Sequence, residues 1–159
     1  MPVRLSDSAG SMGTSPSERW VMTTYPRITS VVLDTTDCRG LAEFYRELFG
    51  LAYRPGDDPP PPGEPDTAGQ DWLVLHDDGV VRLGFQQVAE QRTSTWPEQA
   101  VPQQLHLDAT VSSVQELAEV HQRALALGAR VLLDRSDAPD ERLWVYADPA
   151  GHPFCVFVG

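Results

Sequence analysis

The first part of the chain alternates apolar and polar positions in the patterns of a strand and an amphipathic helix. From Ile28 to Leu33 apolar residues interleave with Thr and Ser, which predicts a partly buried strand that ends in the segment 34–37. Apolar residues then recur at helical spacing between a candidate N-cap, Asp37, and a candidate C-cap, Gly50. These residues are Leu41, Phe44, Tyr45 and Leu48. We expect a helix of about three turns here.

The next segment predicts three strands and one long loop. Residues 51–54 suit a short edge strand, and the segment DDPPPPGEPD at 57–66 is a proline-rich acidic loop that no strand ladder accommodates. Strands are predicted over 72–76 and 80–88, because the Asp-Asp-Gly sequence at 77–79 between them is a hairpin signal. We expect the acidic loop to be a solvated insertion rather than a lid.

The second half repeats this order of elements. A strand over 104–111 is followed by a helix that begins at Ser112 or Ser113 and runs to about Leu127, where Gly128 ends it. Three further strands are predicted over 131–133, 143–147 and 154–158, with a turn at 148–151 before the last one. The pattern indicates an internal duplication: module one at 27–89, a polar linker at 90–102 and module two at 103–159. Trp72 and Trp144 fall on corresponding strands of the two modules.

The N-terminal segment, residues 1–26, has neither apolar periodicity nor the apolar stretch and cleavage site of a signal peptide. We interpret it as a disordered leader, or as the result of an upstream start, with Met22 as the natural first residue. It is left out of the fold prediction.

Charge and composition exclude several function classes. Twelve arginines against 23 aspartates and glutamates give a formal net charge of −11, which disfavours nucleic acid and anionic membranes as partners. No apolar stretch is long enough for a membrane span. Cys38 and Cys155 lack zinc or redox spacing, so reduced thiols in a cytoplasmic protein are expected. The absence of lysine and asparagine indicates a GC-rich bacterial source.

Several motifs occur in order along the two modules. They are VVLDTTD at 31–37, FYRELFGL at 44–51, LGFQQV at 83–88, QLHLDATV at 104–111 and DPAGHPFCVF at 148–157. Together with the repeated βαβββ order, they resemble the vicinal oxygen chelate superfamily, and within it the short bacterial glyoxalase-like and bleomycin-resistance-like proteins. The resemblance covers residues 27–159. It implies an α+β fold in which two βαβββ modules form a curled mixed sheet with a concave cleft and with the helices outside.

The resemblance also implies where a divalent metal would bind in metal-using members. The four positions carry Ser30, Gly84, His106 and Cys155 in this sequence. Among these residues His106 alone matches the His and carboxylate ligands of such sites, so we expect no metal and no other cofactor. An alternative, noncanonical site would combine His106 with Cys155, Asp34 and Gln86.

Side chains of both modules are candidates for lining the cleft. They are Ser30, Asp34, Trp72, Gln86, His106, Trp144 and Cys155. His106 is also the candidate catalytic residue, against the alternative of a histidine bonded to a structural neighbour. Asp34 and Asp108 are either ordered acceptors near Arg82 or Arg142, or an anionic cleft wall. His152, in the turn before the last strand, is expected to face solvent.

The sequence therefore predicts a glyoxalase-like protein that binds a small organic molecule in its cleft without the usual metal, in a sequestration or resistance role. We expect a homodimer with no nucleic-acid or membrane partner. The alternative is an enzyme, a lyase, isomerase or dioxygenase of the vicinal oxygen chelate type, with a noncanonical metal site around His106. Fold alone does not decide between a binding protein and an enzyme.

Overall fold

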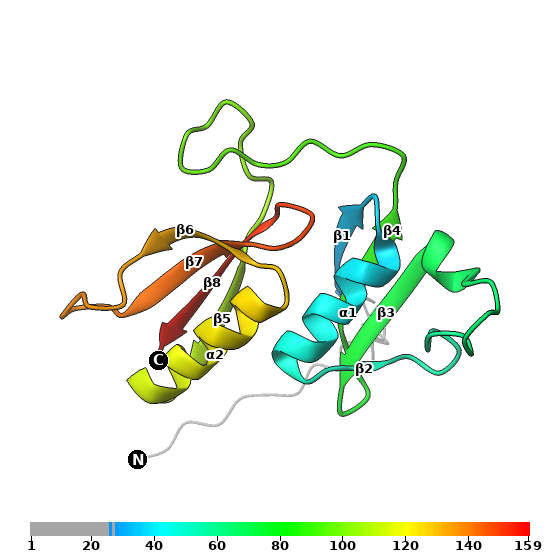
Figure 1. Ribbon diagram of the computed structural model, residues 1–159, viewed down its shortest axis with the longest axis horizontal. Coiled ribbons are helices and arrows are strands. Elements are labelled where there is room, and N and C mark those ends of the chain that lie inside the picture. The colour runs from blue at the N-terminus through cyan, green and yellow to red at the C-terminus, as the bar shows by residue number, and fades with distance from the viewer. Residues whose placement is uncertain (1–25, 27) are drawn as a thin grey trace, which may run out of the picture.

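The chain folds into two modules that lie side by side and are joined by a long linker (Figure 1). The computed structural model describes Pro26 and residues 28–159; the leader predicted over 1–26 lies outside these residues except for Pro26. The linker predicted over 90–102 falls within the strand-free segment 88–106, which crosses from one module to the other.

Both modules have the element order that the sequence predicts. Module one contains β1 (Val31–Thr35), α1 (Cys38–Phe49), β2 (Ala52–Tyr53), the 3-10 helix η1 (Ala68–Gln70), β3 (Trp72–Asp77) and β4 (Val80–Gln87). Module two contains β5 (Leu107–Val111), α2 (Val114–Ala126), β6 (Arg130–Asp134), β7 (Leu143–Ala147) and β8 (Pro153–Val158). The predicted α+β class with two βαβββ modules is confirmed.

Each module builds one mixed sheet, and the two sheets have the same topology. Their strand orders are β1-β4-β3-β2 and β5-β8-β7-β6. The first strand of each module pairs in parallel with the last, and the other pairs are antiparallel. The strands thus form two hydrogen-bonded sheets of four, rather than one continuous sheet, with α1 and α2 on the same side of them (Figure 1).

Helix α1 begins and ends at the residues that the sequence indicates. The Asp37 carboxylate accepts a hydrogen bond of 2.9 Å from the Gly40 N–H, which satisfies one of the free N–H groups of the first turn. At the other end Gly50 has φ 68°, a left-handed conformation that glycine adopts without steric cost. The predicted apolar stripe of α1 is buried against the sheet.

Helix α2 is capped in the same way but is less buried. The Ser113 hydroxyl accepts a hydrogen bond of 3.2 Å from the Glu116 N–H, which decides between the two predicted capping serines. Leu117 and Ala124 are the buried residues of this helix, against six in α1. Among the described residues no helix is long and apolar enough to cross a membrane.

One apolar core joins the two modules, and aromatic residues of α1 supply much of it. Phe154 of β8 is fully buried and packs against three aromatic rings of α1. The ring centroids of Phe44, Tyr45 and Phe49 lie 5.8, 6.2 and 6.5 Å from that of Phe154, in edge-to-face geometry. The helix of module one therefore buries part of the sheet of module two.

The acidic loop 57–66 is tied to the fold at both ends. Arg39 of α1 donates two hydrogen bonds of 2.7 and 3.0 Å to the Asp66 carboxylate and a third, of 2.8 Å, to the Asp57 carbonyl. The Asp57 side chain accepts a hydrogen bond of 2.8 Å from the Val74 N–H and is 7% exposed. The expected solvated insertion is thus held against module one at both of its ends.

Replacing Arg39 by leucine is expected to release this loop, because the variant leaves the Asp57 carbonyl without its donor and the Asp66 carboxylate with the Gly69 N–H alone. We expect a loss of about 2 kcal/mol in the free energy of unfolding, since the paired side chains are mostly buried and the pair is bidentate. Limited digestion with a protease that cleaves before aspartate should release the fragment starting at Asp58 faster than in wild type. Arg130→Leu, at an exposed strand residue, is the matched control. Equal digestion of both variants would contradict the role of Arg39.

Candidate functional site

Three of the predicted cleft residues form a row across the first sheet. Asp34 of β1 is the register partner of Gln86 of β4, and Gln86 is the partner of Trp72 of β3. The strand neighbours Leu33 and Phe85 are buried in the core beneath α1. Because side chains alternate along a strand, the row lies on the face that α1 leaves uncovered.

Two of the three predicted residues of the second sheet, His106 and Cys155, lie next to Asp108 of β5. Cys155 of β8 is its register partner, and His106, which lies just before β5 rather than within it, has Nε2 at 3.6 Å from Oδ1 of Asp108. Burial, and then the charges of Asp108 and Glu141, raise the pKa of the Cys155 thiol to about 11. The thiol is therefore protonated at neutral pH and a weak nucleophile.

Trp144 lies on the opposite face from the one predicted. Its register partner on β8 is Val156, a core residue, and its ring stacks on His121 of α2 with centroids 4.0 Å apart. Trp72 occupies the first position of β3, whereas Trp144 occupies the second position of β7. That offset of one residue turns the second indole toward the helix, because the side-chain period of a strand is two.

Asp34 and Asp108 do not bind the arginines that the sequence suggested. Arg82 pairs with Asp77 at 3.5 Å, and within the described part of the chain Arg142 takes part in no ion pair. Both aspartates are exposed, so neither needs a buried partner.

The positions that the family resemblance assigns to metal ligands do not fit a divalent cation. Gly84 offers no side chain, and a Cβ atom built there would lie 3.0 Å from Cζ2 of Trp72, so an indole occupies the place of a ligand. Ser30 offers a neutral hydroxyl and Cys155 a protonated thiol, which leaves His106 as the remaining good donor. Within residues 28–159, no three His, Cys, Asp or Glu side chains are grouped closely enough to hold a metal ion. His106, Cys155 and Asp34, the three residues of these types in the alternative set with Gln86, are therefore not grouped either.

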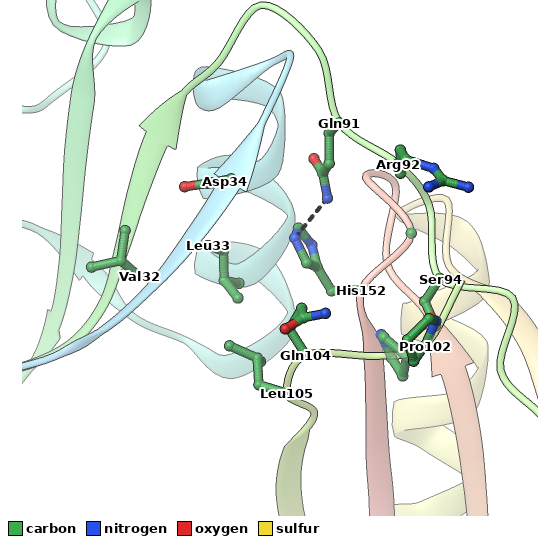
Figure 2. A pocket seen from close by; sticks show the side chains of 12 residues that line it. Val32, Leu33, Asp34, Gln91, Arg92, Ser94, Pro102, Gln104, Leu105 and His152 are labelled. Carbon is green, nitrogen blue, oxygen red and sulfur yellow. Dashed lines mark hydrogen bonds between the residues drawn. The ribbon is translucent and has the colours of Figure 1, made fainter. Parts of the chain in front are cut away.

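A cavity of about 250 Å³, here called the junction cavity, lies between the two modules (Figure 2). Strand β1, the linker and the turn before β8 form its walls. Its apolar lining consists of Val32, Leu33, Pro102, Leu105 and Pro153. Its polar lining consists of Asp34, Gln91, Arg92, Ser94, Gln104 and His152. A cavity of roughly 150 Å³ is known to accept benzene, so the junction cavity has room for a small ring compound.

His152 presents its imidazole to the junction cavity with a buried carboxylate behind it. Its Nδ1 lies 3.0 Å from Oδ2 of Asp148, whose side chain is completely buried. The Tyr45 hydroxyl donates a hydrogen bond of 2.8 Å to the same oxygen. Burial, and then the Asp148 charge, raise the pKa of Tyr45 well above its usual value, so this hydroxyl stays protonated. We call Tyr45, Asp148 and His152 the junction triad.

The turn that carries the triad is held by its own backbone. Oδ1 of Asp148 accepts hydrogen bonds of 2.9 Å from the N–H groups of Ala150 and His152. The same carboxylate therefore fixes both the turn and the imidazole, and four donors satisfy it in a site without solvent access.

A linker residue closes the other side of the imidazole. Nε2 of Gln91 lies 2.8 Å from Nε2 of His152, and Figure 2 shows the Gln91 side chain pointing from the linker to the ring. The Asp34 carboxylate points away from His152 in the same view. Gln91 is therefore the polar group in direct contact with the ring on the cavity side.

The expectation that His152 faces solvent is wrong, since its side chain is 16% exposed. The sequence signal that was missed is the spacing of Asp148 and His152 within the turn DPAGHP, four residues apart. A turn returns its ends to each other, and so it brings this carboxylate and this imidazole together. Nothing in the linker sequence indicated that Gln91 would join them.

Comparisons with known proteins give a family and a fold. A family model described as "glyoxalase-like domain" matches residues 30–157. No curated protein matches the chain. A glyoxalase/bleomycin resistance protein/dioxygenase family enzyme from Burkholderia phytofirmans PsJN superposes with a TM-score of 0.57 at 16% identity, covering 82% of this chain and 96% of that one.

Two further solved structures are similar to the chain. The genomically encoded fosfomycin resistance protein FosX from Listeria monocytogenes has a TM-score of 0.60 at 14% identity, covering 86% of this chain and 95% of that one. A lactoylglutathione lyase from Agrobacterium tumefaciens has a TM-score of 0.52 at 21% identity, covering 86% and 96%. At such identities these likenesses support the fold and leave the chemistry open.

Proposed function

Because this chain belongs to the glyoxalase-like domain family, we propose that it binds a small organic molecule in the junction cavity, without a metal, in a sequestration or resistance role. The observation that carries the proposal is the cavity itself, which combines apolar walls with a few convergent polar groups. This combination is typical of small-molecule sites. A solved structure of similar fold is a fosfomycin resistance protein, which is consistent with such a role.

The proposal includes a homodimer in the cytoplasm. Free Cys38 and Cys155 suit a reducing compartment. Two-fold homodimers are the commonest of the protein oligomers, and dimerisation is compatible with a ligand site inside one protomer.

A screen of small ring compounds by amide NMR tests where ligands bind. We expect hits to shift the amide signals of the linker and of the turn 148–153, because these segments wall the cavity. A ligand at a hundredfold excess over its Kd should also stabilise the fold by about 2.7 kcal/mol. Filling the cavity with Ser94→Trp should abolish the shifts, whereas Gln115→Trp on the exposed face of α2 should keep them. Shifts confined to the face around Trp72 would move the site to the first sheet.

The second candidate is a lyase, isomerase or dioxygenase with a noncanonical metal site around His106, whose ligands would have to come together when the metal binds, because the described residues do not group them beforehand. Its support is the contact between His106 and Asp108 next to Cys155, together with a lactoylglutathione lyase among the similar structures. Elemental analysis of the purified protein, before and after incubation with nickel, zinc, manganese and ferrous iron, separates the two candidates. Near-stoichiometric metal that disappears in His106→Ala would favour the enzyme; none in either protein would favour the metal-free binding site.

A further inference from the structure

The junction triad determines which nitrogen of the His152 imidazole donates a hydrogen bond and which one accepts. We propose that Nε2 of His152 is the recognition point of the site and accepts a hydrogen bond from a hydroxyl or ring N–H group of a neutral aromatic or heteroaromatic ligand, which displaces the Gln91 amide. This inference rests on the proposed function, since it names the class of ligand that the junction cavity takes.

The roles of the two ring nitrogens follow from the contact with Asp148. An ionised carboxylate accepts hydrogen bonds and donates none, so Nδ1 of His152, at 3.0 Å, carries the proton. In the neutral ring Nε2 then holds a lone pair. The Tyr45 hydroxyl and two backbone N–H groups also donate to this carboxylate, which keeps it in place. Nε2 is thus an acceptor whose direction is set by the fold.

Gln91 occupies the position that a ligand donor would take. Its amide N–H group donates to Nε2 at 2.8 Å, which satisfies the lone pair in the ligand-free protein. The amide belongs to the linker rather than to a strand, so its side chain can change rotamer without breaking a hydrogen-bonded ladder. A ligand hydroxyl or N–H group would replace the hydrogen bond from Gln91 by one of its own. The exchange of hydrogen bonds then contributes little to the binding free energy, and burial of the ligand ring supplies the net gain.

The apolar part of the lining, together with the acceptor at Nε2, favours a ring without negative charge. Val32, Leu33, Leu105 and the prolines at 102 and 153 supply apolar surface next to His152. A carboxylate or phosphate group of a ligand would be repelled, because its lone pairs would face the lone pair of Nε2. A ligand with neither donor nor acceptor would bury the imidazole acceptor without a partner. Aromatic alcohols and N–H heterocycles meet both requirements.

Phenol and anisole form a matched pair of probes, because they share the ring and oxygen and differ in the hydroxyl proton. We expect wild type to bind phenol about tenfold more tightly than anisole, as one hydrogen bond at a buried acceptor predicts. In His152→Phe, which keeps a ring in the turn, the ratio should fall to about one. Amide NMR titration measures both affinities and locates the site.

Two further measurements make the result decisive. Gln91→Leu should bind phenol more tightly than wild type, because no amide must be displaced. Nitrogen-resolved NMR of the wild-type imidazole should show a protonated Nδ1 and an unprotonated Nε2 at mildly alkaline pH, which needs no variant. Equal binding of phenol and anisole by wild type, or a protonated Nε2, would overturn the inference while leaving the proposed function in place. Binding of neither probe at the junction cavity would overturn both.

Discussion

Replacing Asp148 by alanine is expected to lower the free energy of unfolding by about 4 kcal/mol. The variant would leave the Tyr45 hydroxyl, the His152 ring and two backbone N–H groups without their common acceptor. The Asp148 side chain is completely buried, so water would not replace the lost partner without opening the turn. Urea unfolding followed by tryptophan fluorescence measures the loss.

Two controls separate the carboxylate from ordinary substitution effects. Asp148→Asn keeps the shape of the side chain and one acceptor oxygen, but its NH2 group faces donors that it cannot accept from. Because about half of the hydrogen bonds are kept, the loss in the free energy of unfolding should be about half as large. Asp137→Ala, at an exposed aspartate, should stay within about 0.5 kcal/mol of wild type. A loss in Asp148→Ala no larger than in Asp137→Ala would show that the junction triad contributes nothing to stability.

Replacing Phe154 by alanine is the second change with a large expected effect. Phe154 is fully buried against three aromatic rings of α1, so removing its ring should cost about 4 kcal/mol through lost burial and the cavity left behind. The contacts join module two to module one. We therefore expect both modules of wild type to unfold in a single transition, measured by fluorescence and circular dichroism together.

Phe154→Leu and Phe157→Ala are the controls for this change. Leucine keeps most of the volume and should cost less than alanine. Phe157 lies on the same strand but points to the other face and is partly exposed, so its removal should cost clearly less than that of Phe154. Two separate unfolding transitions in wild type would contradict a shared core.

Much of the fold was predictable because its signals are local. Asp37, Gly50 and Ser113 are capping residues next to apolar stripes, and both helices begin where these residues place them. Strands β1 and β5 are the exceptions: they begin at Val31 and Leu107, three residues later than predicted in each case, and Ser30 therefore precedes β1. As a result His106 lies in the strand-free approach to the sheet.

The candidate site was predictable in part. The row of Asp34, Gln86 and Trp72 follows from alternation along strands that were correctly located. Trp144 was assigned to the wrong face because two tryptophans on equivalent strands suggested equivalent orientations, and an offset of one residue reverses them. The contact of Gln91 with His152 joins residues 61 positions apart through a linker without periodicity, and no sequence pattern encodes such a contact.

The linker has a consequence for the origin of the junction cavity. Each module repeats the same elements, but Gln91, Arg92, Ser94 and Gln104 belong to the connection between them. A single ancestral module would lack these residues and therefore one wall of the junction cavity. The cavity as described requires two modules in one chain, and linker substitutions can change its lining while leaving both folded cores intact.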